Sequence, residues 1–370
     1  MKKAAIVAAV GFLLIFSPAP ALGEGARSAV LMEAETGRVL YESNAHEALP
    51  MASTTKIMTA LLALEKGNLQ DTVVAGPNAY GVPGTSIYLE MGEKLTLEDM
   101  LYGLMLASGN DAAVAIAEHI GGSVDRFCRM MTAKAEEIGC ENTVFSTPHG
   151  LPAQGHHTTA WDLALIAREA MKNPVFREIV ATERASLPWQ NHAYNRVLTN
   201  KNKLLSTYPG ALGVKTGYTR AAGRCLVFAA EREGLRLIGV VLNCPDWFEE
   251  ATALLDQGFA QWQMVTAFSR GEAVRQVPVV GGTEAFVQAI AGGDAAAPVK
   301  LDAWPDILIE LPESVPAGVL KGQTLGAVKL LDQGRVISET PLVAAHAVPE
   351  RSFPYGWGRI WRSWLLAPGQ

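Results

Sequence analysis

The spacing of the apolar residues changes along the chain, and this change most constrains the fold. Residues 28–32 and 38–41 read as two strands around the turn Glu35-Thr36-Gly37, which predicts a hairpin. Apolar residues then recur at helical spacing over 53–66, 97–106, 110–120, 124–139 and 159–170. Two apolar strands and a helix follow, over 225–230, 235–242 and 249–260. Strands, a helical middle, strands and a last helix predict an α+β domain with an antiparallel sheet.

The character of the chain shifts after about Arg270. Short runs rich in valine and leucine alternate with glycine, proline and aspartate, as in VPVVGGTEAF, ILIELPE and GAVKLLDQGRVISETPLV. Short strands between turn-forming residues are typical of a β domain. We therefore expect a small all-β domain over residues 269–348, after a first domain over residues 24–268.

Residues 1–23 have the layout of a secretory signal peptide. Lys2 and Lys3 precede an apolar run over 4–16, and small residues stand at Ala21 and Gly23. The apolar run is too short to span a membrane comfortably. We expect cleavage after Gly23 and export of the protein, with an uncleaved anchor as the alternative.

Residues 349–370 form a separate tail, which reads FPYGWGRIWRSWLLAPGQ from position 353 and has no acidic residue after Glu350. A helix here has two faces, an apolar one with Trp357, Ile360, Trp361, Trp364 and Leu365, and a polar one with Arg359, Arg362 and Ser363. Tryptophan and arginine on an amphipathic helix are typical of an anchor at a membrane surface. The alternatives are a terminal helix packed on the β domain and a disordered tail.

Composition argues against several classes of function. The net charge is −6, the pI is near 5.7 and no basic stripe stands out, so we expect no nucleic-acid partner. The cysteines, Cys128, Cys140, Cys225 and Cys244, show no C-x-x-C spacing, which argues against a zinc site or a redox pair. Whether any of them form a disulfide stays open at this point.

Histidine patterns give little support to a metal site. HEALP begins at His46 like a zinc-protease helix, but its fifth position is Pro50. His149, His156 and His157 cluster in the sequence, and we interpret them as a loop packed beside the active site rather than as metal ligands. We therefore expect neither a metal nor a cofactor.

The stretch MASTTKIMTA places a serine and a lysine in the first turn of the helix predicted over 53–66. Residues at i and i+3 share one face of a helix, so Ser53 and Lys56 point the same way. Serine is a weak nucleophile until a base takes its proton. Lys56 can be that base only as a neutral amine, and burial and a nearby positive charge both lower the pKa of a lysine. The alternative is a helix-capping serine with a solvated lysine.

Two later motifs offer the partners that this chemistry requires. Ser108 and Asn110 flank a glycine at a turn between two predicted helices, in MLASGNDAAVAIAE. Lys215, Thr216 and Gly217 stand in GALGVKTGYTRAAG, where the lysine supplies a second cation and the glycine lets a substrate backbone come close. S-x-x-K, S-x-N and K-T-G in this order are nearly the motif set of class A β-lactamases and penicillin-binding proteins.

On these motifs the sequence resembles the serine-type D-alanyl-D-alanine carboxypeptidases, which are low-molecular-mass penicillin-binding proteins. The resemblance runs from about Arg27 to Gln261, through ASTTKIMTALLALE, GTSIYLEMGEKLTLEDMLYGLMLASGNDAAVAIAE, TPHGLPAQGHHTTAWDLA and GVKTGYTRAAGRCLV. The region up to about Val348 resembles the family's C-terminal domain more loosely. The resemblance implies a β-lactamase/transpeptidase-like domain, a small all-β domain and a C-terminal amphipathic helix.

The resemblance also assigns roles to residues of the first two motifs. It implies that Ser53 is the nucleophile that is acylated and that Lys56 is the general base. Ser108 would relay protons to the leaving amine, and Asn110 would orient Lys56 and hydrogen-bond the substrate amide.

For the third motif the resemblance implies substrate binding. Lys215 and Thr216 would hold the terminal carboxylate of the substrate, in a strand that continues through Gly217. The backbone N–H groups of Ser53 and Tyr218 would bind the oxyanion. Tyr218 follows the K-T-G triplet, at a position where family members vary.

The implied activity is removal of the terminal D-Ala from peptidoglycan stem peptides, through an acyl-enzyme on Ser53. The implied setting is the cell wall space at the outer face of the cytoplasmic membrane, with the tail on the membrane surface and β-lactam antibiotics as covalent inhibitors. The alternatives are a D,D-endopeptidase or a β-lactamase on the same fold, and a non-catalytic wall-binding protein.

Overall fold

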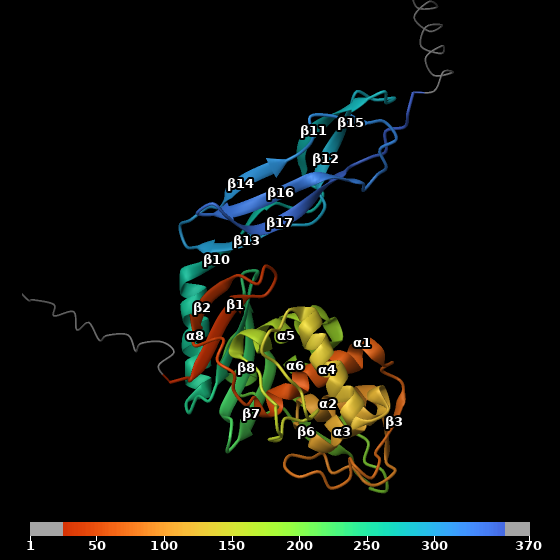
Figure 1. The fold of residues 1–370 in the computed structure, drawn as a ribbon, viewed down its shortest axis with the longest axis vertical. Coiled ribbons are helices and arrows are strands. Elements are labelled where there is room, and N and C mark those ends of the chain that lie inside the picture. The colour runs from red at the N-terminus through yellow and green to blue at the C-terminus, as the bar shows by residue number, and fades with distance from the viewer. Residues whose placement is uncertain (1–24, 352–370) are drawn as a thin grey trace, which may run out of the picture.

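The computed structural model describes residues 25–351, which form two parts arranged end to end (Figure 1). The first part is built on a five-stranded sheet in the order β2-β1-β9-β8-β7, in which every neighbouring pair is antiparallel. Its strands are β1 Ser28–Glu33, β2 Val39–Ser43, β7 Ala211–Thr219, β8 Gly223–Arg232 and β9 Leu235–Leu242. Strands from the beginning of the chain therefore lie beside strands from beyond position 210.

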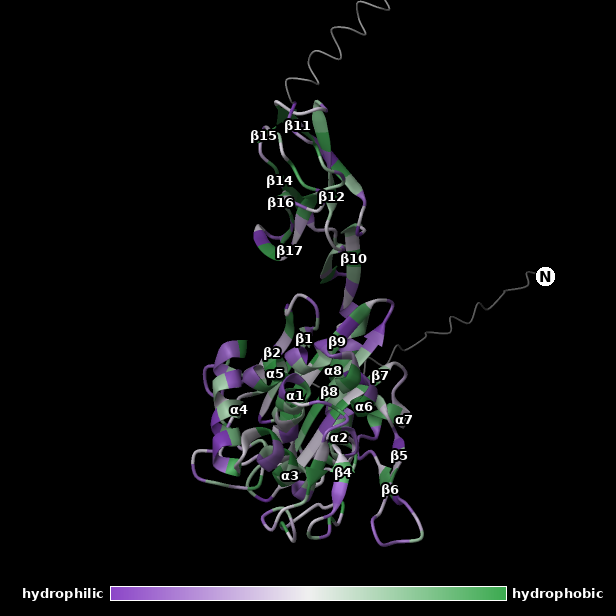
Figure 2. Cartoon of the chain, turned by 90° about the vertical axis from the view of Figure 1, so that its right-hand side faces the viewer, coloured by the Kyte–Doolittle hydropathy of each residue, from purple (hydrophilic) through white to green (hydrophobic). Residues whose placement is uncertain are grey.

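Helices cover both faces of this sheet because its strands are apolar on both faces. Along β1, Val30 and Met32 face one hydrophobic core, whereas Ala29 and Leu31 face the other. Helix α8, Trp247–Gln261, covers most of the second face, where Leu204 also packs, and most of the other helices lie over the first (Figure 1). Figure 2 shows hydrophobic residues where the helices meet the sheet and hydrophilic residues along the outer helix α4, Val124–Ile138.

The helical layer holds the segments that carry the site. Its helices are the 3₁₀ helix η1 Ala52–Thr55, α1 Lys56–Lys66, α2 Leu97–Met105, α3 Asn110–Gly121, α4, α5 Ala160–Lys172, α6 Pro174–Ala181 and α7 Leu204–Thr207. Two small hairpin-like pairs flank it, β3 Thr72–Val74 with β4 Lys94–Thr96, and β5 Arg184–Leu187 with β6 Arg196–Thr199. At the start of α5, the Thr159 side chain accepts a hydrogen bond from the Asp162 N–H at 3.0 Å, which satisfies a backbone donor at the helix start.

The second part is built from strands alone within the described residues. Strand β10 Trp262–Phe268 pairs with β13 Ala295–Lys300, and a six-stranded sheet follows the order β14-β16-β17-β12-β11-β15. The strands of that sheet are β11 Ala273–Val280, β12 Phe286–Ala291, β14 Asp306–Glu310, β15 Val315–Pro316, β16 Thr324–Asp332 and β17 Arg335–Ala344. A core rich in valine, alanine and leucine fills this part.

Polar and stacking contacts of Arg38, at the turn between β1 and β2, join the two parts. Arg38 pairs with Asp332, donates a hydrogen bond to the carbonyl of Pro298 at 2.9 Å, and stacks 4.6 Å from the ring centroid of Trp262. Strand β10 begins where α8 ends, so the chain passes from one part to the other without a linker.

The structure confirms the predicted fold class, with a helix-covered antiparallel sheet followed by a small all-β part. The boundary expected at 268/269 stays a prediction, and β10, which precedes it, pairs with a strand of the second part. The predicted tail helix and signal peptide lie outside the described residues. All four cysteines are buried free thiols, and within residues 25–351 no helix has the length and apolarity needed to cross a membrane.

Candidate active site

The predicted nucleophile stands on a tight turn at the start of the first helix. Ala52, directly before Ser53, has a φ of +47°, an unfavourable backbone conformation for a residue with a side chain. The turn is held from outside by Gly150, where an added Cβ would lie 1.8 Å from the carbonyl oxygen of Ala52. Only glycine fits so close to this turn, and Gly150 itself has a φ of +91°.

A second contact holds the same turn through a histidine. The Nδ1 atom of His156 accepts a hydrogen bond from the Ser146 N–H at 3.0 Å, so its Nε2 carries the proton and donates to Thr55 Oγ1 at 2.9 Å. The Thr55 hydroxyl in turn donates to the carbonyl of Ala52 at 2.8 Å. Burial, with a smaller effect of His157, lowers the pKa of His156 to about 4, so the ring stays neutral at ordinary pH.

Lys56 is fully buried directly behind Ser53. Its Nζ donates to Ser53 Oγ at 3.0 Å, to Asn110 Oδ1 at 2.7 Å and to the carbonyl of His149 at 2.7 Å. Three acceptors fix the amine in a single position, and one of them is the serine hydroxyl oxygen. The first two motifs, 54 positions apart in the chain, therefore meet at one nitrogen atom.

The turn of the second motif is locked by its neighbours. Ser108 has a φ of +64° and is buried, and its carbonyl accepts a hydrogen bond from Thr85 Oγ1 at 2.5 Å. Asn110 opens α3, and its Nδ2 donates to the carbonyl of Pro83 at 2.6 Å. The loop at 83–85 thereby orients the Asn110 amide so that its oxygen is left for Lys56.

The third motif lies on β7, the edge strand of the sheet, next to the nucleophile. A Cβ added to Gly217 would lie 2.9 Å from the backbone nitrogen of Ser53, so the missing side chain lets β7 approach the turn. Thr216 and Tyr218 line the cavity in front of Ser53, whereas Lys215 is buried and donates to the carbonyl of Thr216 at 3.2 Å.

Burial and nearby positive charges weaken the basicity of the two buried lysines. Burial, then the positive charges of Lys215 and Lys201, lowers the pKa of Lys56 well below 10.5, against an opposing effect of Asp111. Burial, then the charge of Lys201, lowers the pKa of Lys215 to about 7. The second cation that the sequence required is present, and Lys201 adds a third.

These groups surround one cavity of about 630 Å³. Ser53, Ser108, Asn110, Thr216, Gly217 and Tyr218 line it, and Lys56 and Lys215 lie behind its wall. A serine hydroxyl beside a lysine of weakened basicity can attack a carbonyl carbon, and the cationic end of the cavity suits a carboxylate. The structure thus brings all eight sequence-predicted residues to one place.

The sequence reasoning missed Lys201, which lines the same cavity and acts electrostatically on both buried lysines. Its only local signal is the polar run Asn200-Lys201-Asn202-Lys203, which matches no catalytic motif. The histidine loop lies beside the site, as predicted, because the carbonyl of His149 contacts Lys56. Within the described residues, no cluster of three or more His, Cys, Asp or Glu side chains is suited to hold a metal ion.

Comparison with known proteins gives the same assignment as the geometry. Residues 17–246 match the family model described as D-alanyl-D-alanine carboxypeptidase, and residues 262–350 match the model of the C-terminal domain of penicillin-binding protein 5. The chain belongs to the D-alanyl-D-alanine carboxypeptidase family. The predicted activity and the predicted class, a serine hydrolase, are thereby confirmed, and the alternatives gain no support.

Curated relatives of this carboxypeptidase match over nearly its whole length. It is 37% identical to D-alanyl-D-alanine carboxypeptidase DacF of Bacillus subtilis, over 90% of this chain and 88% of the relative. It is 32% identical to DacC of Escherichia coli, over 96% of this chain and 94% of the relative.

Solved structures agree in fold across both parts. Penicillin-binding protein 5 of Haemophilus influenzae aligns with a TM-score of 0.74 at 28% identity, covering 88% of this chain and 98% of its own. Penicillin-binding protein 3 of Streptococcus pneumoniae, described as a peptidoglycan synthesis regulatory factor, aligns with a TM-score of 0.76 at 27% identity. The alignment covers 88% of this chain and 99% of that protein's chain.

Proposed function

We propose that this carboxypeptidase removes the terminal D-Ala of peptidoglycan stem peptides through an ester on Ser53. The observation that carries the proposal is the 3.0 Å contact between Lys56 Nζ and Ser53 Oγ, in a site that lowers the pKa of the lysine. In its neutral form Lys56 accepts the Ser53 hydroxyl proton while Oγ attacks the carbonyl carbon of the penultimate D-Ala. Asn110 and the carbonyl of His149 keep Nζ on the attacking side.

The remaining groups act on the substrate's own charges. The N–H groups of Ser53 and Tyr218 stabilise the oxyanion of the tetrahedral intermediate. The close approach of β7 to the turn at Gly217 brings these two N–H groups together. The terminal carboxylate binds at Lys215 and Thr216. When the C–N bond breaks, the proton held by Lys56 passes through Ser108 to the leaving amine of D-Ala. Water then hydrolyses the ester and frees Ser53.

The same geometry accounts for β-lactams as covalent inhibitors. A β-lactam carries a strained amide and a carboxylate, so Ser53 opens the ring and forms an ester. The leaving nitrogen stays attached to this ester, which therefore persists longer than the ester formed from a stem peptide.

Intact mass after incubation with benzylpenicillin tests the nucleophile. We expect one adduct on the wild type and on Ser206→Ala, whose serine is exposed outside the cavity, and none on Ser53→Ala. Release of D-Ala from a soluble pentapeptide ending in D-Ala-D-Ala is expected to follow the same pattern. An adduct on Ser53→Ala, or normal D-Ala release by it, would refute the assignment.

The setting proposed for the enzyme is the outer face of the cytoplasmic membrane. The layout of residues 1–23 and the Trp- and Arg-rich tail support it. Flotation with anionic vesicles tests the tail: the mature enzyme should float with the vesicles, and a form ending at Ser352 should not. Equal flotation of the two forms would remove the anchor from the proposal.

A further inference from the structure

A second cavity, of about 650 Å³, adjoins the catalytic one. Gly84, Thr85 and Lys201 line both cavities, so the two share a boundary. The second cavity lies between the loop that follows Gly84 and the pair β5–β6. None of the eight predicted site residues lines it, and the carboxypeptidase mechanism makes no use of its walls.

Three aromatic residues, Tyr88, Trp189 and Tyr194, line this second cavity. The exposed fractions of Tyr88 and Tyr194 are 71% and 63%, which is high for large rings. Trp189 supports Tyr194 from the same wall, edge to face at 5.7 Å between centroids, and its own ring packs against His192 and Arg196. Exposed aromatic rings around a hollow mark an interaction surface.

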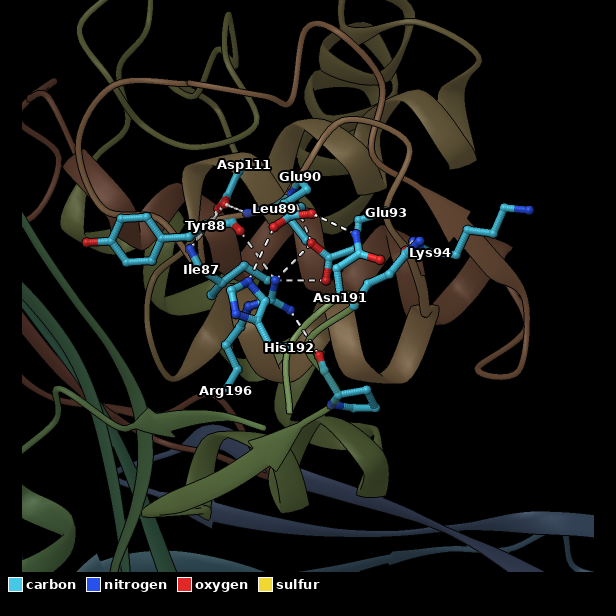
Figure 3. A network of polar contacts seen from close by, with 12 residues as sticks. Ile87, Tyr88, Leu89, Glu90, Glu93, Lys94, Asp111, Asn191, His192 and Arg196 are labelled. Atoms are coloured by element: carbon cyan, nitrogen blue, oxygen red, sulfur yellow. Dashed lines mark hydrogen bonds and ion pairs between the residues drawn. The ribbon is translucent and has the colours of Figure 1, made fainter. Parts of the chain in front are cut away.

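The two walls are fastened to each other by a buried ion pair. Nη2 of Arg196 donates to both carboxylate oxygens of Glu93, at 2.7 and 2.8 Å, and both side chains are almost fully buried (Figure 3). Glu90 accepts further hydrogen bonds from Asn191 at 3.1 Å and, at 3.3 Å, from the ring of His192 when Nε2 carries the proton. In Figure 3 the ring of Tyr88 points away from this network. The cavity therefore exists before any ligand binds.

One residue couples this cavity to the catalytic site. The carboxylate of Asp111, next to Asn110, accepts hydrogen bonds from the N–H groups of Ile87 at 3.1 Å and Leu89 at 3.0 Å. These contacts bracket Tyr88 and hold it in a left-handed conformation, with a φ of +59°. The start of α3 thus positions both the catalytic amide and the exposed ring.

The chemistry of the lining indicates an uncharged ligand with apolar faces and hydroxyl groups. Arg196 is neutralised by Glu93, so the free charge in the lining is that of Lys201, at the boundary shared with the catalytic cavity. The remaining polar groups are neutral: the hydroxyls of Thr85, Ser86 and Thr199, the Asn195 amide and the polar groups of the aromatic residues. Rings that stack and neutral groups that hydrogen-bond fit a pyranose sugar with N-acetyl substituents.

The position of the cavity determines which sugar of the polymer can reach it. Lys201 lies on the cationic side, where the terminal carboxylate of the stem peptide binds under the proposed function. The stem's own sugar is at its opposite end, so it does not reach this side. A sugar here therefore belongs to another part of the polymer.

We propose that the second cavity binds the glycan strand of polymeric peptidoglycan adjacent to the stem peptide that is cut. This proposal rests on the carboxypeptidase function proposed above. It assigns the exposed rings of Tyr88 and Tyr194 to binding of the polymer, with Trp189 supporting Tyr194, and gives the enzyme a preference for assembled wall over free peptide.

The first test compares two substrates. The variant Tyr88→Ala/Tyr194→Ala removes exposed rings only, and Tyr80→Ala, with an exposed fraction of 56% and no place in either cavity, is the matched control. We expect the double variant to lose about tenfold in kcat/KM for D-Ala release from insoluble peptidoglycan, from two stacking contacts. Its kcat/KM for a soluble pentapeptide should equal that of the wild type and of Tyr80→Ala.

The second test measures binding without catalysis. Full-length enzyme is sedimented with glycan strands whose stem peptides have been removed by an amidase. The wild type and Tyr80→Ala should sediment, and the double variant should stay in solution. Equal sedimentation of all three, or an equal loss on soluble pentapeptide, would overturn the glycan assignment. Failure of the wild type to release D-Ala from the pentapeptide would instead refute the underlying function.

Discussion

The buried ion pair Arg196–Glu93 makes a quantitative prediction about stability. Glu93 is fully buried, and besides Arg196 its side chain has the Glu90 N–H as a partner at 2.9 Å. The change Arg196→Met leaves this carboxylate inside the protein without its cation. Breaking a buried pair from one side costs about 3–5 kcal/mol, because the remaining charge is uncompensated. For a part of this size, that lowers Tm by roughly 6–20 °C.

The assay is thermal unfolding of the full-length enzyme, followed by circular dichroism and by loss of D-Ala release. Arg184→Met is the matched control, because Arg184 is exposed on β5 of the same pair of strands, and it should change stability by no more than about 0.5 kcal/mol. The double variant Arg196→Met/Glu93→Met should be more stable than Arg196→Met, since it removes both charges. The reasoning is refuted if Arg196→Met unfolds like the control, or if the double variant is the less stable of the two.

Three further predictions concern the catalytic cavity. Gly217→Ala places a Cβ 2.9 Å from the backbone nitrogen of Ser53, so the turn must shift, and we expect a lower Tm and about a hundredfold fall in the rate of penicillin adduct formation; an unchanged rate would contradict the close approach. Lys201→Met removes a positive charge that lowers the pKa of Lys215, so the pKa of Lys215 should rise from about 7. NMR titration with ¹⁵N detection of the Lys215 amine measures this pKa, and a lower pKa in the variant would contradict the prediction. His156→Phe leaves the half-buried N–H of Ser146 without its acceptor, so the free energy of unfolding in urea should drop by about 1 kcal/mol, and no drop would show that this contact contributes nothing.

Local signals in the sequence predicted most of the first part of the fold. The strand over 28–32 and the helix that begins near Thr159 are each set by a few neighbouring residues, so both could be identified without tertiary information. The segment over 174–207 was not predicted, because β5, β6 and α7 are four residues each and too short to show a period. A usable signal was present at Asn173-Pro174, where the Asn173 side chain caps α6.

The residues of the site also divide into those that local motifs predicted and those that only tertiary contacts reveal. S-x-x-K, S-x-N and K-T-G are local motifs, and their order along the chain predicted a shared cavity. The ion pair of Arg196 with Glu93 joins positions 103 apart, and the effect of Lys201 on Lys215 acts through space, so neither leaves a local pattern. Sequence reasoning found the residues that define the family's chemistry, whereas the second cavity, built from tertiary contacts, required the structure.

The position of β7 at the sheet edge has one more consequence. An edge strand exposes backbone N–H and C=O groups that can pair with any extended chain, which is a risk for aggregation. Here α6 packs on a face of β7, since a Cβ added to Gly213 would lie 2.9 Å from Val180, and the turn at Ser53 packs against the strand at Gly217. Side chains stand out of the plane of a sheet, so both contacts hold β7 through a face and not through its edge. At Thr216 and Tyr218, which line the catalytic cavity, a stem peptide in an extended conformation can pair with this edge as a sixth strand.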